Sequence, residues 1–148
     1  MGCQFRYIGV NDPEYADARE VRYECLYGEW DLPRSLVEDT DGRAYEHLIA
    51  EEGGRVIGYA RLHLEAGDAK ILQLTVTSEM RGQGVAVALM QELMQRARRE
   101  GRTEVYLDAR EHVIGFYEKL GFVGEGELFL SPRTNTPHLV MRRSLANL

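Results

Sequence analysis

The sequence predicts a single α/β domain, of the α+β kind, with a mixed and mostly antiparallel sheet of about seven strands flanked by helices. Three observations predict this fold. Seven short segments have the β-branched or alternating composition of strands. Other stretches carry apolar side chains at a spacing of 3.6 residues, as helices packed on a sheet do. The longest of these helices connects two strands, and a right-handed crossover of this kind makes the two strands parallel.

The predicted strands are separated by turn residues. They are residues 5–10, 45–51, 56–64, 71–76, 105–109, 122–130 and 138–143. Gly53-Gly54 joins the second strand to the third, because two glycines permit the positive φ that a tight hairpin needs. Residues 30–41, rich in Pro, Asp and Gly, are expected to form a loop with at most a short helical turn, and residues 131–137 a polar loop.

Capping residues mark the predicted helices. Asp12 is placed to cap a first helix over residues 16–26, with Pro13 at its first position. The long helix begins near Val85 and ends before Gly101, since glycine suits the left-handed conformation that follows many helices. A short third helix, over residues 112–120, ends at Gly121 in the same way.

Composition excludes several classes of protein. A chain of 148 residues with 44% apolar and 28% charged residues is typical of one soluble globular domain. The net charge of −6 argues against nonspecific nucleic-acid binding, which needs a basic face. Because no apolar run approaches a membrane span and no signal-peptide pattern is present, we expect no membrane partner and a cytoplasmic location. Cys3 and Cys25 have neither metal nor disulfide spacing, so we expect reduced thiols and no metal.

The most informative stretch is the turn between the strand 71–76 and the long helix. Its sequence is Arg81-Gly82-Gln83-Gly84, followed by Val85 and Ala86. A turn that enters a helix leaves main-chain N–H groups without intrahelical partners, and the helix dipole adds positive potential there. The two glycines let an anion approach the backbone closely, and Arg81 adds a forked cationic donor. We interpret this turn as a pyrophosphate-binding site.

Two other phosphate-binding loops fit less well. A P-loop ends in Gly-Lys-Ser/Thr, and this turn has neither the lysine nor the hydroxyl for Mg²⁺. The dinucleotide fingerprint needs a third glycine where this chain has Val87. A nucleotide-phosphate binder therefore remains an alternative with less support.

What is left of the pattern, Arg81-x-x-Gly84-x-Ala86 after an apolar strand, resembles the coenzyme A signature of the GNAT acyltransferase superfamily. A second motif, FYEKLGF at residues 116–122, closely resembles the F-Y-E-K-x-G-F motif of that family and follows at the right distance. The segments 136–141 and 21–24 are similar to the ElaA-type branch. The resemblance implies a single GNAT domain over residues 1–148.

The resemblance also implies where acetyl-CoA binds. In the family the strand before the turn splays from its parallel neighbour, and the pantetheine arm lies between them. The corresponding positions here are Leu74, Thr75 and Val76, where a main-chain N–H would also polarise the thioester carbonyl. The pyrophosphate would meet the backbone and side chains of Arg81, Gly82, Gln83, Gly84, Val85 and Ala86.

The remaining chemistry needs an acid and a base. The resemblance implies that Tyr117 sits near the sulfur, and a phenol with a reference pKa of about 10 suits that place because it stays protonated at pH 7 and can donate to a departing thiolate. The base that deprotonates the attacking amine is left open among His138, Glu24 and Glu79, with His138 at the proline-histidine position of the ElaA-type ending. Structural roles, a core aromatic ring and a satisfied histidine, are the alternatives for Tyr117 and His138.

Arg22 and Glu24 of the first helix are predicted to contact the acceptor, although Arg22 could equally pair with Glu24 or Asp17. The chain departs from the family at Arg110, where many members carry an asparagine that bonds the pantetheine. It departs again at Gln73, where some members place a glutamate base.

We therefore expect transfer of acetyl from acetyl-CoA to a primary amine by direct attack, because no cysteine or serine is placed as a covalent relay. A homodimer is common in the family and is included in this expectation. The alternative from another class is a coenzyme A-binding module that senses acyl-CoA without chemistry.

Overall fold

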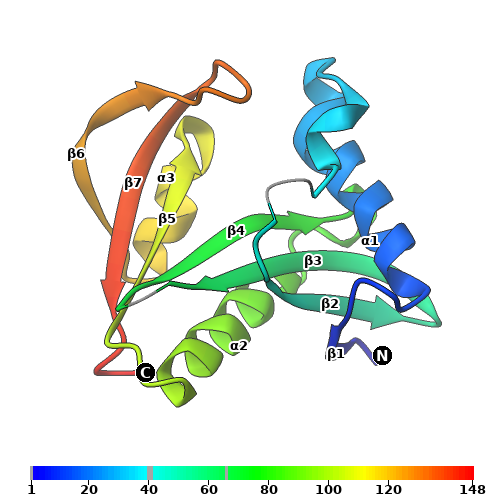
Figure 1. Ribbon diagram of the computed structural model, residues 1–148, viewed down its shortest axis with the longest axis horizontal. Coiled ribbons are helices and arrows are strands. Elements are labelled where there is room, and N and C mark those ends of the chain that lie inside the picture. Colours follow the sequence, from blue (N-terminus) through cyan, green and yellow to red (C-terminus); the bar gives the residue numbers. More distant parts are fainter. Residues whose placement is uncertain (1, 40–41, 66) are drawn as a thin grey trace.

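The computed structural model describes residues 2–39, 42–65 and 67–148, and within them seven strands form one sheet (Figure 1). The strands are β1 (Gln4–Ile8), β2 (Glu46–Glu52), β3 (Arg55–Leu64), β4 (Ala69–Val76), β5 (Glu104–Arg110), β6 (Val123–Leu130) and β7 (Pro137–Ser144). Their spatial order is β1-β2-β3-β4-β5-β7-β6. Every neighbouring pair is antiparallel except β4 and β5, which are parallel, so the predicted sheet is confirmed.

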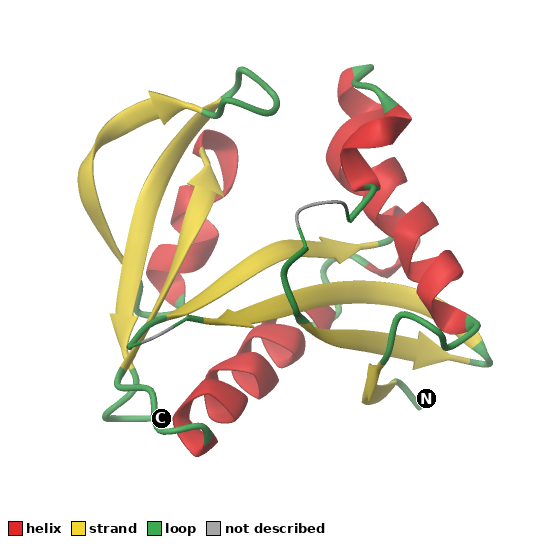
Figure 2. Ribbon diagram, viewed as in Figure 1, coloured by secondary structure: helices red, strands yellow, loops and turns green. Residues whose placement is uncertain are grey.

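Helices cover the sheet on both faces (Figure 2). The helical elements are α1 (Glu14–Arg22), the π turn η1 (Tyr23–Tyr27), the 3₁₀ turns η2 (Gly28–Trp30), η3 (Arg34–Val37), η4 (Ser78–Met80) and η5 (Glu111–Val113), and the helices α2 (Val85–Arg99) and α3 (Ile114–Lys119). The loop predicted over residues 30–41 contains η3, as expected, while its residues 40 and 41 lie outside the described part. None of the described helices is long and apolar enough to cross a membrane.

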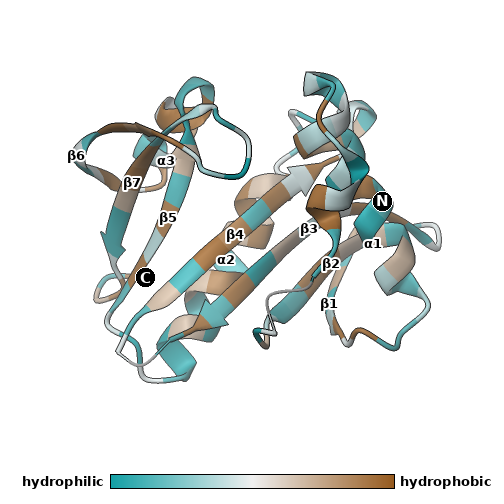
Figure 3. Cartoon of the chain, turned by 45° about the horizontal axis from the view of Figure 1, so that its top comes forward, coloured by the Kyte–Doolittle hydropathy of each residue, from teal (hydrophilic) through white to brown (hydrophobic). Residues whose placement is uncertain are grey.

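Two hydrophobic clusters lie on the two faces of the sheet. The larger one packs α2 and α3 on strands β2 to β5 and β7, and it contains the apolar stripe of α2: Val85, Leu89, Met90, Leu93, Met94 and Ala97. The smaller one packs α1 on β1, β2 and β3. Hydrophobic and hydrophilic residues alternate along the strands in Figure 3. This alternation is expected because successive side chains of a strand point to opposite faces of the sheet. We call the face of the sheet that carries the larger cluster the α2 face and the face that carries the smaller cluster the α1 face.

Most predicted boundaries agree with the structure, but the first helix start does not. Pro13, and not Asp12, precedes the first helical residue, and no side chain caps that helix. The Asp12 carboxylate instead accepts a hydrogen bond from Gly9 N at 2.7 Å, which stabilises the turn before the helix. The prediction for Gly101 is confirmed: its φ is 81°, and its N–H donates to Arg98 O at 3.0 Å, a hydrogen bond that closes α2.

Candidate active site

The turn between β4 and α2 presents free space beside main-chain donors. Gly82 and Gly84 have φ values of 78° and 81°, and a Cβ at either would meet no described protein atom within 4 Å. The first intrahelical bond of α2 runs from Ala88 N to Gly84 O at 3.0 Å. The N–H groups of Val85 and Ala86, one turn earlier, therefore have no intrahelical acceptor. This is the geometry that an anion-binding turn needs.

Two longer side chains frame this turn. Arg81 is half-exposed, donates from Nε to Val76 O at 3.3 Å, and pairs through Nη2 with Glu29 at 3.1 Å. Gln83 Nε2 donates to Glu79 O at 3.4 Å. An anionic ligand at the turn would share Arg81 with Glu29, because a guanidinium offers five donors.

Strands β4 and β5 separate soon after they meet. Lys70 and Tyr106 are the pair in parallel register within the described strands, and beyond them the two strands diverge in Figure 1. The edge of β4 that faces β5 is therefore not covered by a strand ladder near its C-terminal end. The turn at Gly82 and Gly84 follows that end after the short η4, so the two predicted parts of the coenzyme site are neighbours along the chain.

A bulge interrupts β4 at the predicted thioester position. The register with β3 shifts between the pairs made by Leu72 and Thr75, and Gln73 between them has a φ of 57°, which is unusual for a residue other than glycine. Gln73 and Leu74 thus have no partner in the β3 register, and bulges of this kind re-aim backbone groups. No feature of the sequence predicts this bulge.

Tyr117 lies on α3 in the cluster of the α2 face. Its ring is 9% exposed and packs edge-on against Phe116 and Phe122, with centroids 5.1 and 5.9 Å away. Burial raises the pKa of Tyr117 to about 12. Its hydroxyl has no hydrogen-bond partner among the described residues, yet it is not one of their fully buried unpartnered atoms. The aromatic ring of Tyr117 belongs to the core, while its hydroxyl remains available to a ligand.

His138 lies on β7 on the opposite face. Leu139 and Met141 of β7 pack into the cluster of the α2 face, so His138 points to the α1 face by strand alternation. Its Nδ1 is 2.9 Å from Thr136 O. A carbonyl only accepts, so the neutral ring carries its proton on Nδ1 and leaves Nε2 as a proton acceptor. The half-buried ring also lies against Phe129, with the ring centroids 5.9 Å apart.

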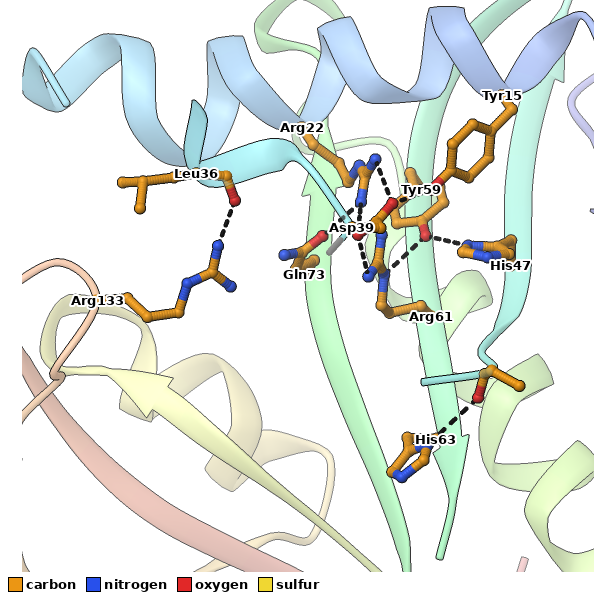
Figure 4. Close-up of polar contacts among 11 residues, drawn as sticks. Tyr15, Arg22, Leu36, Asp39, His47, Tyr59, Arg61, His63, Gln73 and Arg133 are labelled. Carbon is orange, nitrogen blue, oxygen red and sulfur yellow. Dashed lines mark hydrogen bonds and ion pairs between the residues drawn. The ribbon is translucent and has the colours of Figure 1, made fainter. Parts of the chain in front are cut away.

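A network of polar side chains, most of them buried, lies between α1 and the sheet (Figure 4). Its members are Tyr15, Arg22, Asp39, His47, Tyr59, Arg61 and Gln73. The Asp39 carboxylate pairs with Arg22 at 3.3 Å and with Arg61 at 2.7 Å. Two buried guanidiniums thus share this carboxylate, and Nε of Arg22 and Nη2 of Arg61 are buried without a partner among the described groups.

Arg22, predicted to contact the acceptor, is fully buried in this network. It pairs with Asp39 and not with Glu24 or Asp17, the partners considered from the sequence. Its Nη1 donates to Gln73 Oε1 at 2.9 Å, so the structure connects Arg22 to the β4 bulge. Direct binding of an acceptor by Arg22 stays a prediction.

The two glutamates considered as bases differ in surroundings. Glu24 is exposed and lines a shallow depression with Asp17, Glu20 and Arg55. Glu79 is bonded by Arg55, and its pKa lies below the usual range because a main-chain hydrogen bond and then Arg55 favour the carboxylate. A lowered pKa makes Glu79 a weak proton acceptor.

Cys25 is the thiol nearest the end of β4. Its Sγ donates to Val76 O at 3.4 Å, and burial raises its pKa. A protonated, hydrogen-bonded thiol is a poor nucleophile. The described residues contain no group of three or more His, Cys, Asp or Glu side chains that could hold a metal ion.

Comparison with known proteins identifies the family. The model of the acetyltransferase (GNAT) family matches residues 13–122, which is more than half of the chain. The chain belongs to the GNAT family. Among GNAT relatives, the uncharacterized N-acetyltransferase YjcF of Bacillus subtilis is 28% identical over 138 residues, covering 92% of this chain and 96% of YjcF.

Several solved structures share the fold. An acyl-CoA N-acyltransferase from Pseudomonas aeruginosa superposes with a TM-score of 0.82 at 29% identity, over 96% of this chain and 99% of that one. Escherichia coli ElaA gives 0.80 at 21% identity over 97% and 99%. An aminoglycoside 6'-N-acetyltransferase complexed with coenzyme A gives 0.80 at 17% identity over 98% of both chains. Membership of the ElaA-type branch stays a prediction, because ElaA is similar at the level of the fold.

A substitution at Gly84 tests the anion-binding turn. We expect Gly84→Ala to lower the free energy of unfolding by about 1 kcal/mol, because a Cβ is strained at positive φ, and to raise the KM for acetyl-CoA roughly tenfold, since the Cβ fills the approach to the amides. Gly101→Ala is a matched control, because Gly101 has the same φ of 81° at the other end of α2 and an equally open Cβ position. An equal change in KM for both variants would contradict the assignment.

Buried His47 makes stability depend on pH. Its Nδ1 is 2.5 Å from the Tyr59 hydroxyl, and burial, aided by Arg22, lowers its pKa to about 4. The unfolded chain, with a His pKa near 6.5, binds the proton first as the pH falls. Stability is therefore complete above about pH 6.5 and falls by about 3 kcal/mol on the way to pH 4. Urea unfolding of wild type and His47→Gln between pH 7 and 4 should show this loss in the wild type and a shallower slope in the variant.

Proposed function

We propose that the protein is an acetyl-CoA-dependent N-acetyltransferase that transfers acetyl to a primary amine by direct attack in a ternary complex. The observation that carries the proposal is an amide-rich turn that follows a main-chain bulge of β4, at the end of the strand where β4 and β5 separate. Membership of the GNAT family supports acyl transfer from coenzyme A, and one structural neighbour is complexed with coenzyme A.

The coenzyme site follows from these elements. The pyrophosphate would bind the amides of residues 82–86, where the missing Cβ atoms of the glycines leave room. The pantetheine arm would lie along the open edge of β4, at Leu74, Thr75 and Val76. At the bulge, a main-chain N–H would donate to the thioester oxygen, where negative charge develops during attack.

The two proton transfers take place on opposite faces of the sheet. Nε2 of His138 takes one proton from the ammonium and passes it to solvent, and the neutral amine nitrogen then attacks the carbonyl carbon from the α1 face. The carbon–sulfur bond then breaks, and Tyr117 gives its proton to the departing sulfur on the α2 face. With a pKa of about 12, Tyr117 holds that proton through the neutral range. Atoms and charge balance, since the nitrogen of the new amide gives up its second proton, which returns to the tyrosinate through solvent.

A His138→Gln variant tests the base. Deprotonating an ammonium with a reference pKa of about 10.4 costs roughly 4 to 5 kcal/mol at pH 7, and a base lowers the barrier that this step imposes. We expect kcat/KM to fall about 100-fold at pH 7 and the deficit to narrow toward pH 10, where the amine loses its proton to water. The measurement is the pH profile of thiol release, and a deficit of equal size at all pH values would argue for a structural role.

Two inexpensive measurements test the function as a whole. Melting temperature should rise with coenzyme A and not with ATP or NAD, because ligands stabilise the state that they bind. Thiol release from acetyl-CoA should then appear with at least one amine of a broad acceptor panel. Binding of coenzyme A without turnover of any amine would favour the acyl-CoA-sensing module, and a shift with ATP or NAD alone would overturn the proposal. The cytoplasmic location and a homodimer stay predictions.

A further inference from the structure

Arg110, at the end of β5, turns its side chain to the α1 face. Val105, Leu107 and Ala109 of β5 pack into the cluster of the α2 face, so alternation sends Arg110 to the other side. Its Nη2 donates to Leu26 O of η1 at 2.6 Å. Its guanidinium also lies over the rings of Trp30, at 5.3 Å, and Tyr27, at 6.0 Å.

This position is at the level of the proposed reaction. Lys70 and Tyr106 are in parallel register, and four residues further along each strand bring Leu74 and Arg110 to corresponding levels, within the one-residue offset that the bulge adds. Leu74 is the proposed thioester position, and the two strands have diverged there. Arg110 therefore faces the reacting carbonyl from the side on which the amine would arrive.

The charge of Arg110 has no carboxylate partner among the described residues, although its side chain is half-buried. In contrast, Arg22 and Arg61 are paired with Asp39, and Arg81 is paired with Glu29. Burying part of a charge without a counter-ion is unfavourable. Leu26 O occupies one of five N–H donors, so the guanidinium keeps a forked pair for a ligand.

The neighbours of Arg110 fit an organic acceptor. His138 is its cross-strand partner in the β5–β7 register and lies on the same face. Phe129 packs on His138, and Trp30 packs on His112, and both outer rings remain exposed, by 36% and 46%. A cation, the proposed base and two exposed aromatic rings thus gather on one side of the proposed thioester.

We propose that Arg110 is a specificity-determining residue that binds a carboxylate of the acceptor, so that the acceptor is a primary amine carrying a carboxylate, such as an amino acid or a short peptide. This inference rests on the proposed function and names the substrate class of the same site. The carboxylate pairs with the guanidinium fork of Arg110, and the amine reaches Nε2 of His138 beside it. A carboxylate on the acyl donor would offer the same chemistry, but it would have to extend from the coenzyme side to the α1 face.

The test uses matched acceptors. A panel of amino acids and dipeptides, each as free acid and as C-terminal amide, is assayed for thiol release from acetyl-CoA with wild type, Arg110→Gln and Arg110→Lys. The wild type should prefer the free acids at least tenfold in kcat/KM. Arg110→Gln should raise KM for the acids by about 10- to 100-fold, leaving the amides and the KM for acetyl-CoA unchanged, since one charge-assisted hydrogen-bonded pair is lost. Arg110→Lys should keep part of the preference.

Arg142→Gln is the matched control. Arg142 lies on the same face, opposite Tyr106 at the joined end of the strands, and is paired with Glu125 at 2.8 Å. Removing this charge should leave the ratio of kcat/KM for free acids to that for amides unchanged. A change as large as that of Arg110→Gln would show that the preference depends only on the net charge of the protein, and it would overturn the inference.

Other outcomes are equally decisive. Equal rates for acids and amides in the wild type, or an equal loss for both in Arg110→Gln, would show that Arg110 only holds Leu26 and would overturn the inference. If Arg110→Gln instead abolished transfer from succinyl-CoA while sparing acidic acceptors, the carboxylate would belong to the acyl donor and the acceptor assignment would fail. Turnover of carboxylate-free amines alone would refute this inference and leave the proposed function intact. No turnover and no stabilisation by coenzyme A would refute both.

Discussion

Replacing Tyr117 with phenylalanine is expected to lower kcat for thiol release by at least about 100-fold, the usual contribution of a positioned general acid. The substitution removes one hydroxyl that has no protein partner among the described residues, so the ring contacts with Phe116 and Phe122 should persist. The free energy of unfolding and the binding of coenzyme A should therefore stay close to those of the wild type. Steady-state rates at pH 6 to 10, together with urea unfolding, make the comparison.

Tyr106→Phe is the matched control for Tyr117. Its hydroxyl donates to Glu65 Oε1 at 2.7 Å, at the end where β4 and β5 meet and away from the proposed thioester. Loss of this hydroxyl should change kcat less than twofold. Unchanged turnover in Tyr117→Phe would remove this residue as the acid and leave it a core aromatic.

The largest effect on stability is expected at Asp39. Asp39→Asn removes the negative charge shared by the buried guanidiniums of Arg22 and Arg61, 3.3 and 2.7 Å away. Leaving buried charges without a partner costs about 3 to 5 kcal/mol, so urea or thermal unfolding should show a loss of that size. The loss should occur without any change at the turn of Gly82 and Gly84, because the two arginines that pair with Asp39 lie on α1 and β3 and not at that turn.

A second substitution separates charge from packing at this network. Arg22→Met in the Asp39→Asn background should recover part of the stability, since it removes one of the two unpaired cations. As an exposed comparison, Glu51→Gln breaks the pair with Arg6 at 2.7 Å and should cost less than about 1 kcal/mol. A loss in Asp39→Asn no greater than in Glu51→Gln would mean that the network adds little to folding.

The sequence predicted the elements whose geometry depends on local rules. The hairpin glycines Gly53 and Gly54 and the helix end at Gly101 have the positive φ expected of them, and a tight turn forms at Gly82 and Gly84 as predicted. The apolar stripe of α2 faces the core as its spacing indicated. The prediction that Asp12 caps the first helix was wrong by one residue. The Asp12 carboxylate accepts a hydrogen bond from Gly9 N, and the helix N-terminus has no side-chain cap.

By itself, then, the sequence determined the order of strands and helices, the glycine turn before α2 and the family, because turns, periodicity and short motifs are encoded by neighbouring residues. Only the tertiary structure decided that Gln73 lies in a bulge, that Arg22 is buried against Asp39, and that Tyr117 and His138 face opposite sides of the sheet. It also decided that Arg110 bonds to Leu26 O of η1 and lies opposite His138 in the β5–β7 register. These facts depend on contacts between residues far apart in the chain, which no local pattern specifies.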